Sequence, residues 1–295
     1  MQFSAGDTYR SVPFSVRRDY DDGRIVPNEG TKILDIDSPA LKIGNCSINE
    51  KQKVVKEATV VKPIKTTCSL SKYDVELHRY TNAIQTTYAS YVRNGGDGEG
   101  VLKIRGETLG YDNAFLDKLL PIENSDEIKQ LFMSFCGSGN PLRIDDDKHL
   151  PKQGETVVDL GCGAGHDLIL SSALVGSYGK VVGVDFTQAM LDQSQANVGK
   201  YCTTNPSSFG AFEFVKGGID DPKLLSVEQN PDLRESANVV ISNGVFNLCA
   251  KKLQAFKTAF DLLKAGGRFL LNDVCVVDEN PNVTISCTIG DDVSS

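Results

Sequence analysis

Residues Val157–Gly165 read V-V-D-L-G-C-G-A-G, an apolar run that contains one acid and ends in three glycines at alternate positions. Such a run is typical of a strand buried on both faces of a parallel sheet. Gly161, Gly163 and Gly165 allow a tight turn and a close approach to a ligand, because no Cβ atom stands in the way. The apolar residues at 168–174 suit a helix. The stretch therefore predicts the start of an α/β unit with a ligand at the glycine turn.

The spacing of the glycines separates two kinds of nucleotide ligand. Dinucleotide-binding proteins use G-x-G-x-x-G and place a pyrophosphate at the N-terminus of the next helix. Here the spacing is G-x-G-x-G, and Asp159 precedes the first glycine, where a carboxylate would repel a pyrophosphate but attract an ammonium group. A second buried strand, Lys180–Asp185, ends in Asp185, which can accept hydrogen bonds from both ribose hydroxyls. An ammonium and a ribose without a phosphate describe S-adenosylmethionine rather than NAD.

At these residues the chain resembles the class I S-adenosylmethionine-dependent methyltransferases; an unrelated α/β protein with a glycine-rich turn is the alternative. A sharper resemblance, from about Tyr88 to Val274, is to the arsenite methyltransferase group. The S-N-x-V-x-N-L motif is more particular to this group than the glycine and aspartate motifs are. Besides the glycine motif, the matching segments are G-N-P-L (139–142), L-V-G-S-Y-G-K-V-V-G-V-D (174–185), V-I-S-N-G-V-F-N-L (240–248) and L-L-K-A-G-G-R-F (262–269).

The resemblance assigns cofactor contacts to residues at the carboxyl ends of the expected strands. Phe186 would lie beside the adenine, Ile219 and Asp220 would read the adenine N1 and N6 atoms, and Asn243 would face the methyl group. Ordinary roles are the alternatives: capping for Asp159, core packing for Phe186 and surface polarity for Asn243. The expected cofactor-binding residues are Asp159, Gly161, Cys162, Gly163, Gly165, Asp185, Phe186, Ile219, Asp220 and Asn243.

The resemblance does not extend to the arsenic ligands. Arsenite methyltransferases hold As(III) through three thiolates, but here the first position is Ser138, the second is Gly244, and the chain ends before the third. A soft metalloid needs thiolate ligands, which a hydroxyl or a glycine does not supply. Cys136 and Cys249 are close enough in sequence to be considered as substitutes. The expected substrate pocket comprises Cys136, Ser138, Gly244 and Asn247, and no metal site is expected.

The sequence indicates no catalytic base. Methyl transfer from a sulfonium is an in-line displacement, which needs alignment and a desolvated pocket more than acid–base help. His166 follows the glycine loop and could act as a base, although its position also suits an ordinary helix N-terminus. His78 and His149 have no partner in the sequence and are expected on the surface. The competing hypothesis is a cofactor-binding domain that has lost catalysis and acts as a regulator or partner.

The composition limits the partners that we expect. The formal net charge of −8 and the pI near 5.0 argue against nucleic acid, because phosphate binding needs clustered Lys and Arg. No apolar run is long enough to span a membrane, and the N-terminus lacks the pattern of a signal peptide, so a cytoplasmic location is expected. The eight cysteines contain no C-x-x-C pair and are expected to be free, mostly buried thiols. We expect a small-molecule methyl acceptor; the oligomeric state stays open.

The order of elements predicts a doubly wound, mainly parallel α/β sheet within residues 151–278, with a helical lead-in at 71–150 and a tail at 279–295. Residues 1–70 are expected to be an extension, flexible in its first thirty residues. Class I methyltransferases usually finish with a helix and an antiparallel hairpin, but only 22 residues follow Asp273. Either the sequence is a fragment, or the sheet is shortened and its edge is covered by the extension.

The individual elements are expected as follows. Helices are predicted from about Leu70 to Val92, with Val75, Tyr80, Ile84 and Tyr88 on one face, and at Thr108–Leu120, Thr187–Tyr201 and Leu253–Leu263, the last capped by A-G-G at 265–267. Strands are predicted at Ala211–Lys216, Ala237–Ser242 and Arg268–Asp273, with weaker candidates at Thr31–Ile36, Ala58–Val61 and Val283–Thr288.

Overall fold

The computed structural model describes residues 9–18, 25–27, 72–93, 109–120, 131, 137–143, 147–202, 206–226 and 229–276, and every structural statement below concerns these residues. Within them, no helix is long and apolar enough to cross a membrane. The weaker strand candidates at 31–36, 58–61 and 283–288 lie outside the described residues, as does Cys136. The domain boundaries remain predictions.

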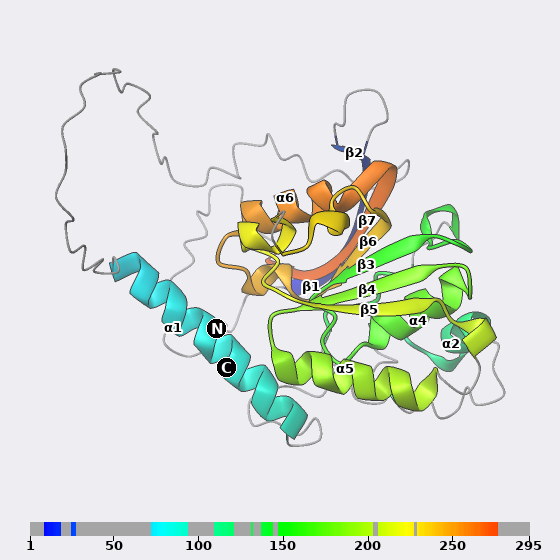
Figure 1. Cartoon of the computed structure of the whole chain (residues 1–295), viewed down its shortest axis with the longest axis horizontal. Helices are drawn as coiled ribbons and strands as arrows, with labels where there is room; N and C mark the ends of the chain where they lie inside the picture. The colour runs from blue at the N-terminus through cyan, green and yellow to red at the C-terminus, as the bar shows by residue number, and fades with distance from the viewer. Residues whose placement is uncertain are drawn as a thin grey trace.

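A seven-stranded sheet with the order β2-β1-β7-β6-β3-β4-β5 forms the centre of the molecule (Figure 1). Neighbours among the last five strands pair in parallel, as a doubly wound sheet requires. These five strands are β3 (Thr156–Leu160), β4 (Lys180–Asp185), β5 (Ala211–Lys216), β6 (Ala237–Asn243) and β7 (Leu263–Val276). The predicted fold class is confirmed.

Helices cover both faces of the parallel strands (Figure 1). Val157 and Val158 are adjacent in β3 and point to opposite faces, yet neither is exposed to solvent. One face packs against α6 (Lys252–Leu262) and the other against α4 (His166–Val175). The remaining helices are α1 (Lys72–Arg93), α2 (Asn113–Leu119) and α5 (Gln188–Tyr201), with short 3-10 turns η3 (Asp147–His149), η4 (Pro206–Ser208), η5 (Pro222–Leu225), η6 (Pro231–Leu233) and η7 (Phe246–Leu248).

The edge of the sheet beside β7 is covered by the N-terminal segment. The strand β1 (Tyr9–Arg18) pairs antiparallel with β7, and β2 (Ile25–Pro27) pairs antiparallel with β1. The sequence analysis predicts no strand in the first thirty residues and is wrong for these two segments. The overlooked signal is an alternation of period two, in which Val12, Phe14 and Val16 are separated by shorter residues. Part of the N-terminal extension therefore lies along this edge of the sheet.

Two predicted element ends also differ from the structure. The helix α2 begins five residues later than predicted because Gly110 takes a positive φ of 95° and the Asp112 side chain caps the helix by accepting from the Phe115 N–H. The predicted cap at 265–267 is wrong. The helix α6 ends at Leu262 and β7 starts at once, so that A-G-G lies in the irregular start of that strand, where its register against β6 shifts.

Candidate cofactor and acceptor site

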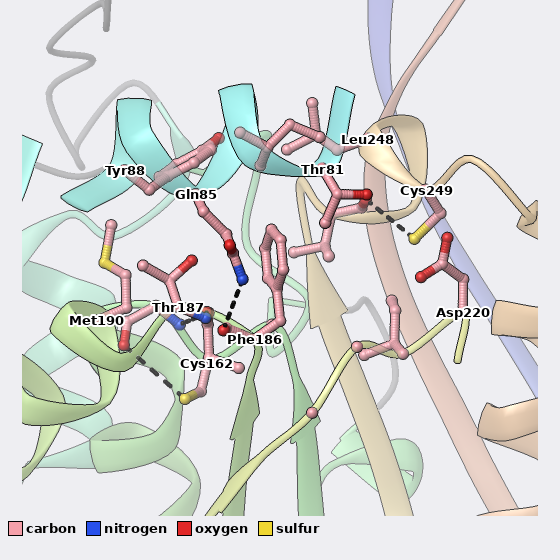
Figure 2. A pocket seen from close by; sticks show the side chains of 18 of the residues that line it. Thr81, Gln85, Tyr88, Cys162, Phe186, Thr187, Met190, Asp220, Leu248 and Cys249 are labelled. Atoms are coloured by element: carbon pink, nitrogen blue, oxygen red, sulfur yellow. Dashed lines mark hydrogen bonds between the residues drawn. The ribbon is translucent and has the colours of Figure 1, made fainter. Parts of the chain in front are cut away.

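A cavity of about 500 Å³ lies where β3, β4 and β6 end. The glycine turn after β3, the end of β4, the G-G-I-D segment after β5 and the end of β6 form its floor. The helix α1 forms its roof and lies beside α5 (Figures 1 and 2). Thr81, Gln85 and Tyr88 reach from α1 toward the cavity, and the Gln85 side-chain amide donates to the Phe186 carbonyl oxygen at 3.2 Å. The cavity therefore lies at the sheet edge that binds ligands in open α/β folds.

Gly163 and Gly165 have different roles in the glycine turn. All three glycines of the turn have positive φ, at 80° for Gly161, 52° for Gly163 and 87° for Gly165. A Cβ atom at Gly163 would meet nothing within 4 Å, so the space above it is open to a ligand. At Gly165 a Cβ atom would lie 2.3 Å from the Ser194 Oγ atom, and this glycine does not line the cavity. Gly165 thus serves the packing of the turn against α5, and its cofactor contact stays a prediction.

Asp159 is the penultimate residue of β3 and a buried carboxylate in the cavity wall. No described group donates a hydrogen bond to it, and no described basic side chain forms an ion pair with it. Burial and the neighbouring charges of Asp167 and Asp185 raise its pKa well above the ordinary value. Since an unpaired buried charge is costly, this side chain is built to receive a cation.

Asp185 ends β4 with its two oxygens fixed by backbone. Its Oδ2 atom accepts from the Gly163 N–H at 3.1 Å and its Oδ1 atom accepts from the Thr187 N–H at 2.8 Å. Burial raises the pKa of this carboxyl, although those hydrogen bonds act in the opposite direction. Each oxygen keeps a lone pair for a further donor. Such a fixed, bidentate acceptor matches the two hydroxyls of a ribose.

The residues expected around the adenine form a part of the cavity lining that we call the adenine wall. Phe186, Ile219 and Asp220 all line the cavity, and Phe186 stands upright between the sheet and α1 (Figure 2). The Asp220 Oδ2 atom accepts from the Lys251 N–H at 3.2 Å, which fixes the carboxylate beside this wall. Cys249 lies on the same wall, and its thiol donates to the Val245 carbonyl oxygen at 3.5 Å. Burial raises the pKa of this thiol to about 12.

Comparison with known proteins gives the family. Residues 151–292 match the family model described as a methyltransferase domain. Over these residues, just under half of the chain, the sequence is that of a class I S-adenosylmethionine-dependent methyltransferase domain. Its cofactor is S-adenosylmethionine, and the residues present fit that molecule, because no described basic side chain pairs with Asp159 and the space above Gly163 is open.

The relatives of this methyltransferase domain include arsenite methyltransferases. That of Halobacterium salinarum is 40% identical over 168 residues, which are 57% of this chain and 36% of the relative. That of Homo sapiens is 31% identical over 129 residues, 42% of this chain and 32% of the relative. An arsenic(III) S-adenosylmethionine methyltransferase structure from Chlamydomonas reinhardtii is 29% identical, has a TM-score of 0.42, and covers 54% of this chain and 48% of its own. The chain spans about a third of the length of these curated relatives.

The methyltransferase domain brings two of the expected pocket residues together. A Cβ atom at Gly244 would lie 2.7 Å from the Ser138 Oγ atom, although the two residues are far apart in sequence. Gly244 lines the cavity and has a φ of 70°, whereas Ser138 lies just behind it. Asn247 is not part of the cavity wall; its backbone N–H donates to Asp273 Oδ2 at 3.0 Å.

Asn243 lines the cavity, but its amide is occupied by the protein. Its Oδ1 atom accepts from the backbone N–H groups of Ser138 and Gly139, at 2.9 and 3.2 Å. Its Nδ2 atom lies 2.7 Å from the Gly139 carbonyl, 2.9 Å from Asp167 Oδ2 and 3.0 Å from Tyr111 Oη. The side chain therefore anchors the turn at 137–143 to the sheet and positions the site around it.

Sequence reasoning missed Tyr111 and Asp167. Tyr111 precedes α2, and its hydroxyl donates to Asp167 Oδ1 at 2.5 Å. Asp167 lies in the first turn of α4 and lines the cavity. Their only sequence signals are an acid directly after the glycine loop and an aromatic residue in the lead-in, and neither signal reveals the contact.

The histidines occupy different environments. His166 is the first residue of α4 and lines the cavity, and its Nε2 atom lies 3.0 Å from the Leu131 carbonyl oxygen. His78 is exposed on α1 but borders the cavity, while His149 is half-buried in η3 rather than on the surface.

Proposed function

We propose that this chain is an enzyme that moves the methyl group of S-adenosylmethionine to a small organic molecule bound beneath α1. The observation that carries the proposal is the pair of carboxylates at the ends of adjacent strands. Among the described residues Asp159 has no hydrogen-bond or ion-pair partner and suits a cation, and Asp185 presents two fixed oxygens that suit a diol. The acidic charge of the chain supports a small acceptor rather than nucleic acid, and we place the enzyme in the cytoplasm.

Different residues of the site would bind the cofactor and exclude water during an in-line displacement. The bound cofactor supplies an electrophilic methyl group on a sulfonium. Asp159 would bind the amino-acid end of the cofactor and Asp185 the ribose, which fixes the direction in which the methyl group points. The roof formed by Ile84, Tyr88 and Tyr91 of α1 would exclude water from the reacting atoms. Alignment and desolvation of this kind supply most of the rate enhancement that such a reaction needs.

The acceptor that we propose is not arsenite, despite the names of the relatives. Gly244 and Ser138 stand together where the resemblance puts two thiolates, and neither residue supplies one. The one described thiol on the adenine wall, Cys249, has a pKa near 12 and is a neutral thiol at physiological pH. Because the thiolate is the form that binds soft ions, Cys249 is a poor substitute.

A domain that binds the cofactor without turning it over is the second candidate. The observation that favours it is the occupied amide of Asn243, which leaves no described side chain free to act on the acceptor at that strand end. Asp159 and Asp185 serve cofactor binding under either candidate, so only turnover separates the two.

The test is turnover of S-adenosylmethionine with a labelled methyl group in a protein-free metabolite extract. The proposal expects label in a small organic product with the wild type and none with Asp185→Ala. Asp192→Ala, which removes an exposed acid on α5, is the matched control and should keep full activity. Cofactor binding without label transfer in any extract would favour the second candidate.

A further inference from the structure

The structure assigns a cofactor contact to Asp167: we infer that Asp159 and Asp167 together hold the ammonium of the methionyl group, with Tyr111 and Asn243 as the residues that position Asp167. The inference rests on the proposed function, because it concerns the same cofactor. It adds a second carboxylate, Asp167, to which the sequence analysis assigns no role. It also adds the two residues that position Asp167 by hydrogen bonds.

The two carboxylates form an acidic pair in the wall of the cavity. Asp159 is 2% exposed and Asp167 5%, and both line the cavity. The charge of Asp167 is one of the causes that raise the pKa of Asp159, so the two carboxyls are near enough to interact. Among the residues that the structure describes, no Lys, Arg or His forms an ion pair with either one. Two buried charges of the same sign without a counter-ion call for a cation supplied from outside the chain.

The two members of the pair differ in their hydrogen bonds. Asp159 receives none from any described residue, and it lines the cavity. Asp167 is held on both oxygens, by the Tyr111 hydroxyl at 2.5 Å and the Asn243 amide at 2.9 Å. The Asn243 amide also reaches Tyr111 Oη at 3.0 Å, which closes the three side chains into a ring of contacts. Tyr111 and Asn243 therefore fix the direction of the Asp167 carboxylate and leave it able to accept one more donor.

An ammonium suits this arrangement better than a metal ion does. No group of three or more His, Cys, Asp or Glu side chains in the described residues is arranged to hold a metal. An ammonium has three N–H donors and can bond to two carboxylates at once. Of the positive groups on the cofactor, the ammonium alone has N–H donors, and it is present both before and after methyl transfer.

The experiment compares ligands that differ in this one group. Isothermal calorimetry on the full chain would use S-adenosylhomocysteine, its deaminated analogue, and 5′-methylthioadenosine, which lacks the amino-acid part. With the wild type, we expect the deaminated analogue to bind roughly a hundredfold more weakly than S-adenosylhomocysteine. Because this arm needs no variant, it holds even if a substitution disturbs folding. Equal binding of the two ligands would overturn the inference.

Variants then assign the effect to the residues. Asp167→Asn should weaken S-adenosylhomocysteine roughly ten- to a hundredfold and leave 5′-methylthioadenosine unchanged. Tyr111→Phe should show the same selectivity with a smaller loss, and the double variant should lose little more than Asp167→Asn alone, since Tyr111 acts through Asp167. Asp192→Asn is the control on α5.

Each other outcome has a definite meaning. Loss of turnover by Asp167→Asn with unchanged S-adenosylhomocysteine binding would make Asp167 a base toward the acceptor and would overturn the inference. Equal weakening of both nucleosides would show a general disturbance of the site and would also overturn it. If the wild type binds neither nucleoside, the proposed function itself fails. If Asp185→Ala weakens both nucleosides while Asp167→Asn weakens neither, only this inference fails.

Discussion

The cavity has a cofactor half and an acceptor half, and the two treat their polar groups in opposite ways. In the cofactor half, at the ends of β3 and β4, no described residue bonds to Asp159, and the two oxygens of Asp185 accept from the backbone N–H groups of Gly163 and Thr187. In the acceptor half, at the end of β6 and the turn at 137–143, the Asn243 amide is fully used within the protein and Gly244 packs against Ser138. The cofactor half therefore offers hydrogen-bond acceptors to a ligand, whereas in the acceptor half the Asn243 amide is already bonded within the protein.

The largest expected effect falls on the cofactor half. Asp185→Ala removes two charge-assisted acceptors for the ribose and should weaken S-adenosylhomocysteine binding by roughly 2–4 kcal/mol. Calorimetry checks this against Asp192→Ala, which removes an exposed acid on α5. An unchanged dissociation constant for Asp185→Ala would place the ribose elsewhere and would end the distinction between the two halves. The same calorimetry should detect no tight binding of NAD, because Asp159 would repel a pyrophosphate.

The sequence allowed the cofactor half to be predicted because its chemistry follows from local order. The strands β4 and β5 agree with their predicted bounds, and Asp159, Asp185 and Asp220 all line the cavity. The carboxyl ends of parallel strands meet at one edge, so residues in this pattern are brought together by topology alone.

The remaining parts depend on contacts between distant segments. The face of α1 with Tyr80, Ile84 and Tyr88 was predicted as apolar, but periodicity cannot say which surface a helix covers. The contact between Tyr111 and Asp167 joins the lead-in to α4 across 56 positions of sequence. The partner of β7 is likewise set by pairing with β1, far away in sequence.

The next effect separates two glycines within the cofactor half. Gly165→Ala places a methyl group 2.3 Å from Ser194 Oγ at a φ of 87°, and should lower the free energy of unfolding by roughly 2–3 kcal/mol. Gly163→Ala meets nothing within 4 Å and should cost roughly 1 kcal/mol, through its φ of 52° alone. Its methyl group enters the space left for the cofactor, so binding should fall more than stability does. Denaturant titration and calorimetry measure both quantities, and equal losses of stability for the two variants would contradict the division.

A smaller effect tests whether the burial of Asp159 lowers the free energy of unfolding of the ligand-free protein. Burial, then the charges of Asp167 and Asp185, raises its pKa in the folded state. The folded state therefore binds the proton more readily than the unfolded state, and stability falls as the pH rises from about 4 toward the raised value. Asp159→Asn should increase the free energy of unfolding of the ligand-free protein at about pH 8 by on the order of 1 kcal/mol, with a smaller gain near pH 5. It should also lose cofactor binding. A variant that is less stable than the wild type at both pH values would show that Asp159 has a structural partner.

The smallest effect is expected in the acceptor half, when a cysteine replaces Ser138 at the first expected thiolate position. Ser138→Cys should change the free energy of unfolding by less than about 0.5 kcal/mol, because the side chain is only half-buried. It should not create arsenite methylation.

The second thiolate position is Gly244, whose φ of 70° disfavours a side chain and whose Cβ atom would lie 2.7 Å from Ser138 Oγ. Arsenic held by a single thiolate would be poorly aligned with the methyl group, and misalignment alone can cost about a hundredfold in rate. The test supplies arsenite, glutathione and labelled cofactor to the wild type and to Ser138→Cys, and looks for methylarsenicals. Robust product from the wild type that disappears on Cys136→Ser or Cys249→Ser would mean that those cysteines bind the metalloid, and the acceptor half would then be as specific as the cofactor half.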